Sequence, residues 1–165
     1  MEKIIEELKK KSRIKKGKSY VVSNISDEII NGPMRGWICG HFYPQGSDFH
    51  RHDIEICVKT LAIGKSEKLH YHLCSFEFLI VLDGGVEYEL EGDHITLTPG
   101  MFYMLHPGNT EHIVEVRKET TILAVRLPSI PNNKIYVDGK LAGEAFEQRG
   151  SLFSSDSPVM QIGTL

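Results

Sequence analysis

Along most of the chain, apolar and polar residues alternate in short runs of the kind that form β-strands. In VEYELEG, Val86, Tyr88 and Leu90 alternate with three glutamates. A period of two places successive side chains on opposite faces of a strand. Turn-forming residues such as Gly84-Gly85, a hairpin signal, separate these runs. The pattern from about residue 34 onward therefore predicts a series of short strands.

The segment DIEICVKTLAIG, residues 53–64, alternates in the same way. One of its faces carries Ile54, Ile56 and Val58, and the other carries Glu55, Cys57 and Lys59. No second helical pattern lies between the strands, so βαβ units are not expected. The fold class that follows is all-β, either a sandwich or a barrel.

The two ends of the chain have different patterns. In MEKIIEELKKK the apolar residues lie on one side of a helix, with acidic residues leading and lysines following, which suits the helix dipole. We expect one short amphipathic helix that ends near Ser12. After Pro128 the sequence is rich in Pro, Gly, Ser and Asn, and only KIYV is typical of a strand. The predicted parts are a helix and basic linker at 1–33, a barrel at 34–128 and a C-terminal arm at 129–165.

The charge is uneven along the chain. The first 18 residues hold eight basic and three acidic side chains, a net charge of +5, which leaves −8 for the rest of a chain whose net charge is −3. This basic run lacks the interleaved aromatic residues that stack on bases, so we interpret it as a solvated helix end. One helix is also not a helix-turn-helix. We therefore expect no nucleic-acid partner.

The remaining composition is that of an ordinary globular protein, with 41% hydrophobic and 25% charged residues. The charged start lacks the apolar core of a signal peptide, and no window approaches the ~20 apolar residues that span a bilayer. We expect a cytoplasmic protein with no membrane partner. The odd number of cysteines, three, and the lack of a CxxC pair argue against a disulfide framework, and Cys74 is expected to be a buried or half-buried thiol.

The strongest chemical signal is GKSEKLHYHLCSFEFLIVLDG, residues 64–84. His70 and His72 are two positions apart on a strand, so they project from one face, roughly 6.6 Å apart along the backbone. A turn at LCS would bring Glu77 back beside them. Two imidazoles and a carboxylate suit a first-row divalent metal with open coordination positions.

The candidates for a fourth ligand lie in GMFYMLHPGNTEHIVEV, residues 100–116. His112, Val114 and Val116 share one face of the expected strand, and the valines need a core. His112 is therefore a plausible metal ligand. His106 precedes Pro107, which restricts it to extended or turn geometry, and we expect it to lie outside the metal site.

A second HxH pair, His50 and His52, lies close to Glu55. It lacks flanking glycines, and Glu55 would lie on the opposite face from His52. We interpret this pair as a pocket rim or plain surface. His41 and His94 have no visible partners in the sequence.

The two motif-bearing segments resemble the paired motifs of the cupin superfamily. The first segment follows the family pattern G-x5-H-x-H-x4-E-x6-G without a gap. The second is looser than the family's G-x5-P-x-G-x2-H, since His106 stands at the proline position and one extra residue separates Gly108 from His112. The resemblance covers about residues 55–127. It implies a double-stranded β-helix, or jelly-roll barrel, that holds Fe, Mn, Ni or Zn at His70, His72, Glu77 and His112.

A fold does not determine an activity. The resemblance implies a metal-dependent isomerase, epimerase or dioxygenase acting on a small oxygen-rich molecule, such as a sugar derivative or a keto or hydroxy acid. The alternatives are a non-catalytic module that binds or senses a small ligand, and a purely structural barrel. Tyr88, Tyr103 and Arg126 have strand positions suited to assisting catalysis. A homodimer is expected, because many single-barrel cupins pair through their sheets and open sheet edges need cover.

Overall fold

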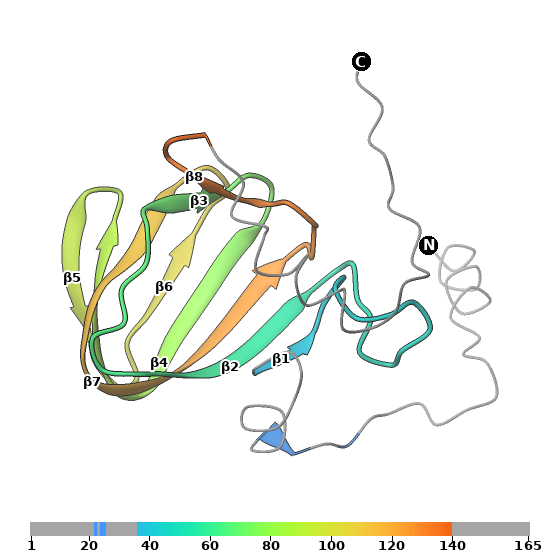
Figure 1. The fold of residues 1–165 in the computed structure, drawn as a ribbon, viewed down its shortest axis with the longest axis horizontal. Helices are drawn as coiled ribbons and strands as arrows, with labels where there is room; N and C mark the ends of the chain where they lie inside the picture. Colours follow the sequence, from blue (N-terminus) through green and yellow to red (C-terminus); the bar gives the residue numbers. More distant parts are fainter. Residues whose placement is uncertain (1–21, 23, 26–35, 140–165) are drawn as a thin grey trace, which may run out of the picture.

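The computed structural model describes residues 22, 24, 25 and 36–139 (Figure 1). The predicted N-terminal helix and basic run, and the arm beyond residue 139, lie outside the described residues. The strands are β1 (Trp37–Cys39), β2 (Glu55–Leu61), β3 (His70–His72), β4 (Phe76–Leu90), β5 (Asp93–Leu97), β6 (Phe102–Leu105), β7 (Thr110–Leu127) and β8 (Lys134–Tyr136). The prediction of an all-β barrel is confirmed. In the described part of the chain, no helix is long and apolar enough to cross a membrane.

One antiparallel sheet curls around the interior, and its two long strands, β4 and β7, determine its shape (Figure 1). They pair along their whole length, from Phe76 opposite Leu127 to Leu90 opposite Glu111. β7 also pairs with β2 near its C-terminal end and with β3 near its N-terminal end. β5 and β6 both pair with β4, and β8 pairs with β3. The KIYV segment is thus a strand, as predicted, and it extends the sheet beyond residue 128.

Gly84 and Gly85 do not end a strand, contrary to the hairpin prediction, because β4 runs through them. The pairing of β4 with β7 shifts register at this point. Gly84 has a φ of 91°, and a Cβ there would lie 2.3 Å from the backbone oxygen of Glu119. The Thr120 hydroxyl accepts a hydrogen bond from the Gly85 N–H at 2.9 Å. The double glycine therefore lets two long strands approach and bend, rather than turning the chain back.

The interior of the barrel has an apolar part and a polar part. Leu79, Val81, Val86 and Val116 are among its most deeply buried apolar side chains. The interior face of β2, however, carries Glu55, Cys57 and Lys59, since these residues lie opposite the inward-facing residues of β7. The alternation predicted for β2 is present, but its more polar face points inward. Such an arrangement is costly without compensating partners, and it marks the polar part of the interior as a site.

Candidate metal centre

His70 and His72 project together into the interior from the short strand β3. The strand lies between β7 and β8, which fixes its orientation. The two residues are 2% and 5% exposed, and their ring centroids are 5.6 Å apart. The prediction that both imidazoles point to one place is confirmed.

A turn at residues 73–75 brings Glu77, the first inward-facing residue of β4, back beside these histidines. Asn133 holds the turn: its Oδ1 accepts from the Cys74 N–H at 2.7 Å, and its backbone oxygen accepts from the Leu73 N–H at 2.8 Å. Glu77 Oε2 consequently lies 3.1 Å from His72 Nε2. The sequence prediction of this turn is confirmed.

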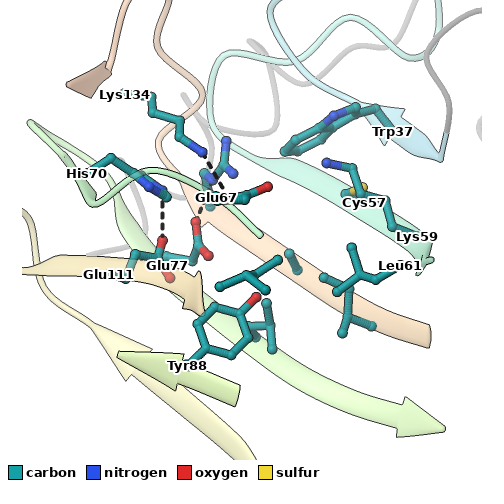
Figure 2. Close-up of a pocket in the computed structure, with 15 residues that line it drawn as sticks. Trp37, Cys57, Lys59, Leu61, Glu67, His70, Glu77, Tyr88, Glu111 and Lys134 are labelled. Atoms are coloured by element: carbon teal, nitrogen blue, oxygen red, sulfur yellow. Dashed lines mark hydrogen bonds and ion pairs between the residues drawn. The ribbon is translucent and has the colours of Figure 1, made fainter. Parts of the chain in front are cut away.

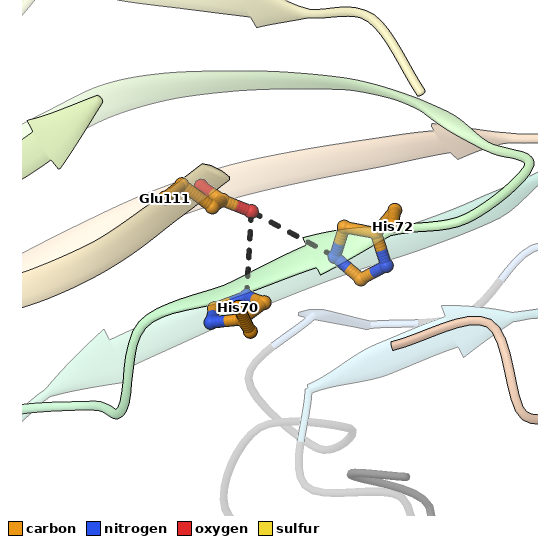
Figure 3. Close-up of side chains that lie close together, drawn as sticks. All are labelled: His70, His72 and Glu111. Carbon is orange, nitrogen blue, oxygen red and sulfur yellow. Dashed lines mark ion pairs between the residues drawn. The ribbon is translucent and has the colours of Figure 1, made fainter. Parts of the chain in front are cut away.

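Glu111, which the sequence reasoning missed, completes the cluster (Figure 3). It lies opposite His70 in the pairing of β3 with β7. Its Oε1 is 3.5 Å from His70 Nε2 and 3.7 Å from His72 Nε2. One ligand atom from each of the three residues lies within 4.8 Å of the others. Within the described ranges, this is the one such group of three metal-ligating side chains.

The interpretation that His112 and Val114 face the core is wrong, whereas Val116 does face it as predicted. His112 lies opposite Glu89 of β4 and is only partly buried, although its Nδ1 is enclosed and makes no hydrogen bond. The inward-facing residues here are Glu111 and Ile113. The register between β4 and β7 shifts after Ile113, so Val116 also points inward. A β-bulge inserts one extra residue and changes which alternate positions face inward.

A network of hydrogen bonds orients the two carboxylates. The Tyr103 hydroxyl bridges them, bonding to Glu77 Oε1 at 2.9 Å and to Glu111 Oε2. Arg126 donates from Nε to Glu77 Oε2 at 2.6 Å. Burial alone would raise the pKa of Glu77, but Arg126 and His72 outweigh it and hold that pKa well below its usual range. Burial, followed by the charge of Glu77, raises the pKa of Glu111.

The ring nitrogens of His72 are available as metal ligands. Both of its ring nitrogens are buried and make no hydrogen bond, even though Nε2 is close to Glu77. Burial, and then the charge of Arg126, lowers the pKa of His72 to about 4, so the imidazole is neutral at neutral pH. In His70, Nδ1 lies 2.8 Å from the backbone oxygen of Lys68, which favours a proton on Nδ1 and a free lone pair on Nε2. Neutral imidazole lone pairs beside carboxylate oxygens form a donor set that fits a first-row divalent metal.

The cluster borders a cavity of about 60 Å³ (Figure 2). Lys59, Arg126 and Lys134 contribute positive charge to its lining, and Glu67 and Tyr88 line it as well. Lys134 Nζ lies 3.3 Å from Glu67 Oε2. The space admits a few water-sized groups next to the cluster.

The family described as "Cupin domain" matches residues 57–126. Among solved structures, the DMSP lyase DddQ from Ruegeria pomeroyi DSS-3 is similar with a TM-score of 0.51 and 18% identity, over 65% of this chain and 54% of that one. A cupin protein from Bacteroides fragilis has a TM-score of 0.48 and 15% identity, over 70% and 87% of the two chains. KdgF from Halomonas sp. has a TM-score of 0.45 and 22% identity, over 48% and 72%. No curated protein matches the sequence.

Residues 57–126 of the chain form a cupin domain. Counting the second cupin motif from Gly100 without a gap places Glu111, and not His112, at the position of the family's histidine. The extra residue assumed before His112 was therefore unnecessary. A strict count of motif positions was the signal in the sequence that could have identified Glu111.

The assisting residues expected in this cupin all lie inside the barrel. Tyr88 and Tyr103 are 4% and 7% exposed, with ring centroids 5.4 Å apart. Arg126 contacts Glu77 and also Glu55, whose Oε2 lies 3.4 Å from its Nη1. These positions are consistent with a supporting role around the cluster.

The second HxH pair of this cupin lies at the surface. His50 is half-buried and His52 is exposed, with their Nε2 atoms 3.0 Å apart, while Glu55 turns away into the barrel. His41, for which the sequence suggested no partner, has Nδ1 2.9 Å from Ser129 Oγ and 3.2 Å from Glu55 Oε1.

The exposed His94 contacts Glu89 at 3.3 Å. His106 packs against the Phe76 ring and is absent from the metal-ligating group. Cys74 is exposed, contrary to the prediction, because it lies at the tip of the turn that Asn133 holds.

Proposed function

We propose that this cupin binds a first-row divalent metal through His70, His72 and Glu111, with Glu77 completing the ligand set. Glu111 replaces the His112 of the sequence prediction. The observation that carries the proposal is His72, a buried neutral imidazole whose ring nitrogens make no hydrogen bond and whose Nε2 lies 3.1 Å and 3.7 Å from two carboxylate oxygens. Leaving such a group unsatisfied costs about 1–3 kcal/mol, which metal ligation would offset.

We propose further that the protein is an enzyme acting on a small oxygen-rich molecule, as an isomerase, epimerase or dioxygenase. A bound metal supplies a Lewis acid that polarises a substrate oxygen. Arg126 and the Tyr103 hydroxyl keep the Glu77 carboxylate fixed. A substrate that fills this small cavity would displace water, which strengthens electrostatic interactions inside it.

Lys134 and Glu67 are the candidate proton-transfer pair outside the ligand set. Their side chains are in contact, and both line the cavity. Burial lowers the pKa of Lys134, although the charge of Glu67 opposes this effect. A half-buried lysine in contact with a carboxylate at a cavity is an arrangement suited to general acid–base catalysis.

The test begins with elemental analysis of protein purified without added metal. We expect close to one first-row metal ion per chain. The loaded protein is then incubated with a panel of sugar derivatives and of keto and hydroxy acids, and products are followed by NMR. Lys134→Met should keep its metal and lose turnover. Wild-type protein without any first-row metal would overturn the proposal.

The alternative is a module that binds a small ligand without converting it. It is favoured by the small size of the cavity and the deep burial of its histidines, which restrict access. A panel member that binds the loaded protein and is recovered unchanged after long incubation supports this alternative.

A further inference from the structure

The three cations that line the cavity differ in their partners. Arg126 forms ion pairs with Glu77 at 2.6 Å and with Glu55 at 3.4 Å, and Lys134 forms one with Glu67. Lys59 forms no ion pair with any residue that the structure describes. Its charge does act on the half-buried Glu67, where it helps Lys134 to hold the pKa of that carboxyl low against the opposing effect of burial. Lys59 is therefore the cation whose hydrogen-bonding positions are not taken by a carboxylate.

Trp37 provides the surface on which Lys59 rests. The Lys59 ammonium lies 5.2 Å from the centroid of the Trp37 ring, and the Arg126 guanidinium lies 4.9 Å from it. Trp37 is 3% exposed, so the ring is fixed in position. A cation–π contact of this kind orients an ammonium group without neutralising it. Lys59 thus remains available to an anion.

Lys59 and the metal-ligating cluster lie on different sides of one small cavity. Lys59 comes from β2, whereas His70 and Glu111 come from β3 and β7. Figure 2 shows Lys59 and Trp37 on one side of the cavity, with His70 and Glu111 on the other. A molecule bound in this cavity would therefore lie between the two groups.

We propose that Lys59 anchors the carboxylate of the substrate, so that the substrate class is a small hydroxy, keto or sugar acid rather than a neutral sugar. This inference rests on the proposed metal-dependent function of the same cavity. An ammonium–carboxylate hydrogen bond is charge-assisted and stronger than a neutral one. The substrate's other oxygens would then face the cluster of His70, His72 and Glu111.

The experiment uses the metal-loaded full chain and matched pairs of probes. Glycolate, lactate and pyruvate, together with glycolamide, lactamide and pyruvamide, are titrated by calorimetry. We expect at least one acid to bind about ten-fold or more tightly than its amide, the ratio that one hydrogen bond to a charged group provides. Lys59→Met should abolish this preference while leaving amide binding and metal content unchanged. Lys59→Arg should retain part of it.

Two results would overturn the role of Lys59: amides that bind wild type as well as the acids do, or an unchanged preference in Lys59→Met. Binding of neither probe class by the loaded protein would also overturn it. Metal content separates this failure from failure of the proposed function, because a protein without metal contradicts the function itself. Circular dichroism and the melting temperature establish that each variant is folded.

Discussion

The central residue of the site, His72, makes no hydrogen bond through its buried ring nitrogens, whereas the neighbouring Glu77 carboxylate is bonded by Arg126 and Tyr103. Its neighbours Glu77 and Glu111 contribute oxygens on two sides, and Arg126 balances part of their charge. The chemistry of the site therefore depends on a few side chains whose individual removal can be tested.

Removing single ligands should separate the metal centre from its surroundings. We expect His72→Ala and Glu111→Ala each to lower metal affinity by about ten-fold or more. Loss of a residue that only supports a metal ligand already lowers affinity by about ten-fold, and loss of the ligand itself should cost at least as much. His112→Ala is the matched control, because His112 lies on the same strand beside Glu111 but outside the cluster. Metal titration of the folded proteins measures the affinities. Steep loss in His112→Ala with none in Glu111→Ala would contradict the assignment.

The three cysteines should differ sharply in reactivity. Burial raises the pKa of the Cys57 thiol to about 11 and also raises the pKa of Cys39, whereas Cys74 is exposed. At pH 8 a thiol with a pKa near 11 is ionised in about one molecule in a thousand, and the thiolate is the reactive form. We expect one fast-reacting thiol per folded chain with Ellman's reagent and three in denaturant. If the fast phase survives Cys74→Ser, the described environment of these thiols is wrong.

At the scale of elements, the turn between β3 and β4 determines whether His72 and Glu77 meet. Asn133, just before β8, bonds to Leu73, Cys74 and Ser75 through its backbone oxygen and its side chain. It is 7% exposed. A residue 56 positions beyond Glu77 in the sequence thus supports the placement of that ligand.

We expect Asn133→Ala to lower the free energy of unfolding by about 1–3 kcal/mol, since the Cys74 N–H loses its acceptor and the buried Ser75 hydroxyl loses its donor. It should also weaken metal binding, because the turn that places Glu77 loses its support. Denaturant unfolding and metal titration measure the two effects. Asn133→Asp, which keeps the Oδ1 acceptor for Cys74, should lose less of both. Equal losses in the two variants would show that the Oδ1 contact is not what holds the turn.

At the scale of the whole molecule, the barrel combines a partly polar interior with an apolar outer face. We define this outer face by the outward-pointing residues of β4, β6 and β7, which are Phe76, Phe78, Ile80, Phe102, Met104, Leu123, Val125 and Leu127. Phe102 and Met104 are 55% and 61% exposed. A large apolar patch on a protein surface marks an interface. None of the eight residues is charged, so a second copy can pack on the outer face about a two-fold axis without like-charge repulsion.

We therefore expect a homodimer through the outer face, with a mass twice the 18.6 kDa of one chain. Met104→Glu should shift the protein toward monomer in multi-angle light scattering at micromolar concentration, because it places a charge inside the interface. Ile63→Glu is the control, since Ile63 is 69% exposed in the loop after β2 and outside the outer face. A wild-type mass near that of one chain would contradict the prediction.

The sequence by itself determined the features that depend on neighbouring residues. Alternation over residues 53–64 and 86–90 identified strands, because side chains project to opposite faces with a period of two. The spacing of His70, His72 and Glu77 predicted a strand, a turn and a convergent group. These inferences hold because the residues concerned lie within one strand or in two strands joined by a single turn.

The tertiary structure decided which face points inward and which distant residues meet. Periodicity shows that Glu55 and Lys59 share a face, but only the packing of β2 against β7 places that face inside. The bulge after Ile113 is a shift in the pairing register between β4 and β7. Alternation within one strand cannot reveal it, because it depends on the partner strand. Glu111 consequently faces the site in place of His112. Arg126 reaches Glu77 and Glu55, 49 and 71 positions away along the chain, because antiparallel pairing brings their strands together.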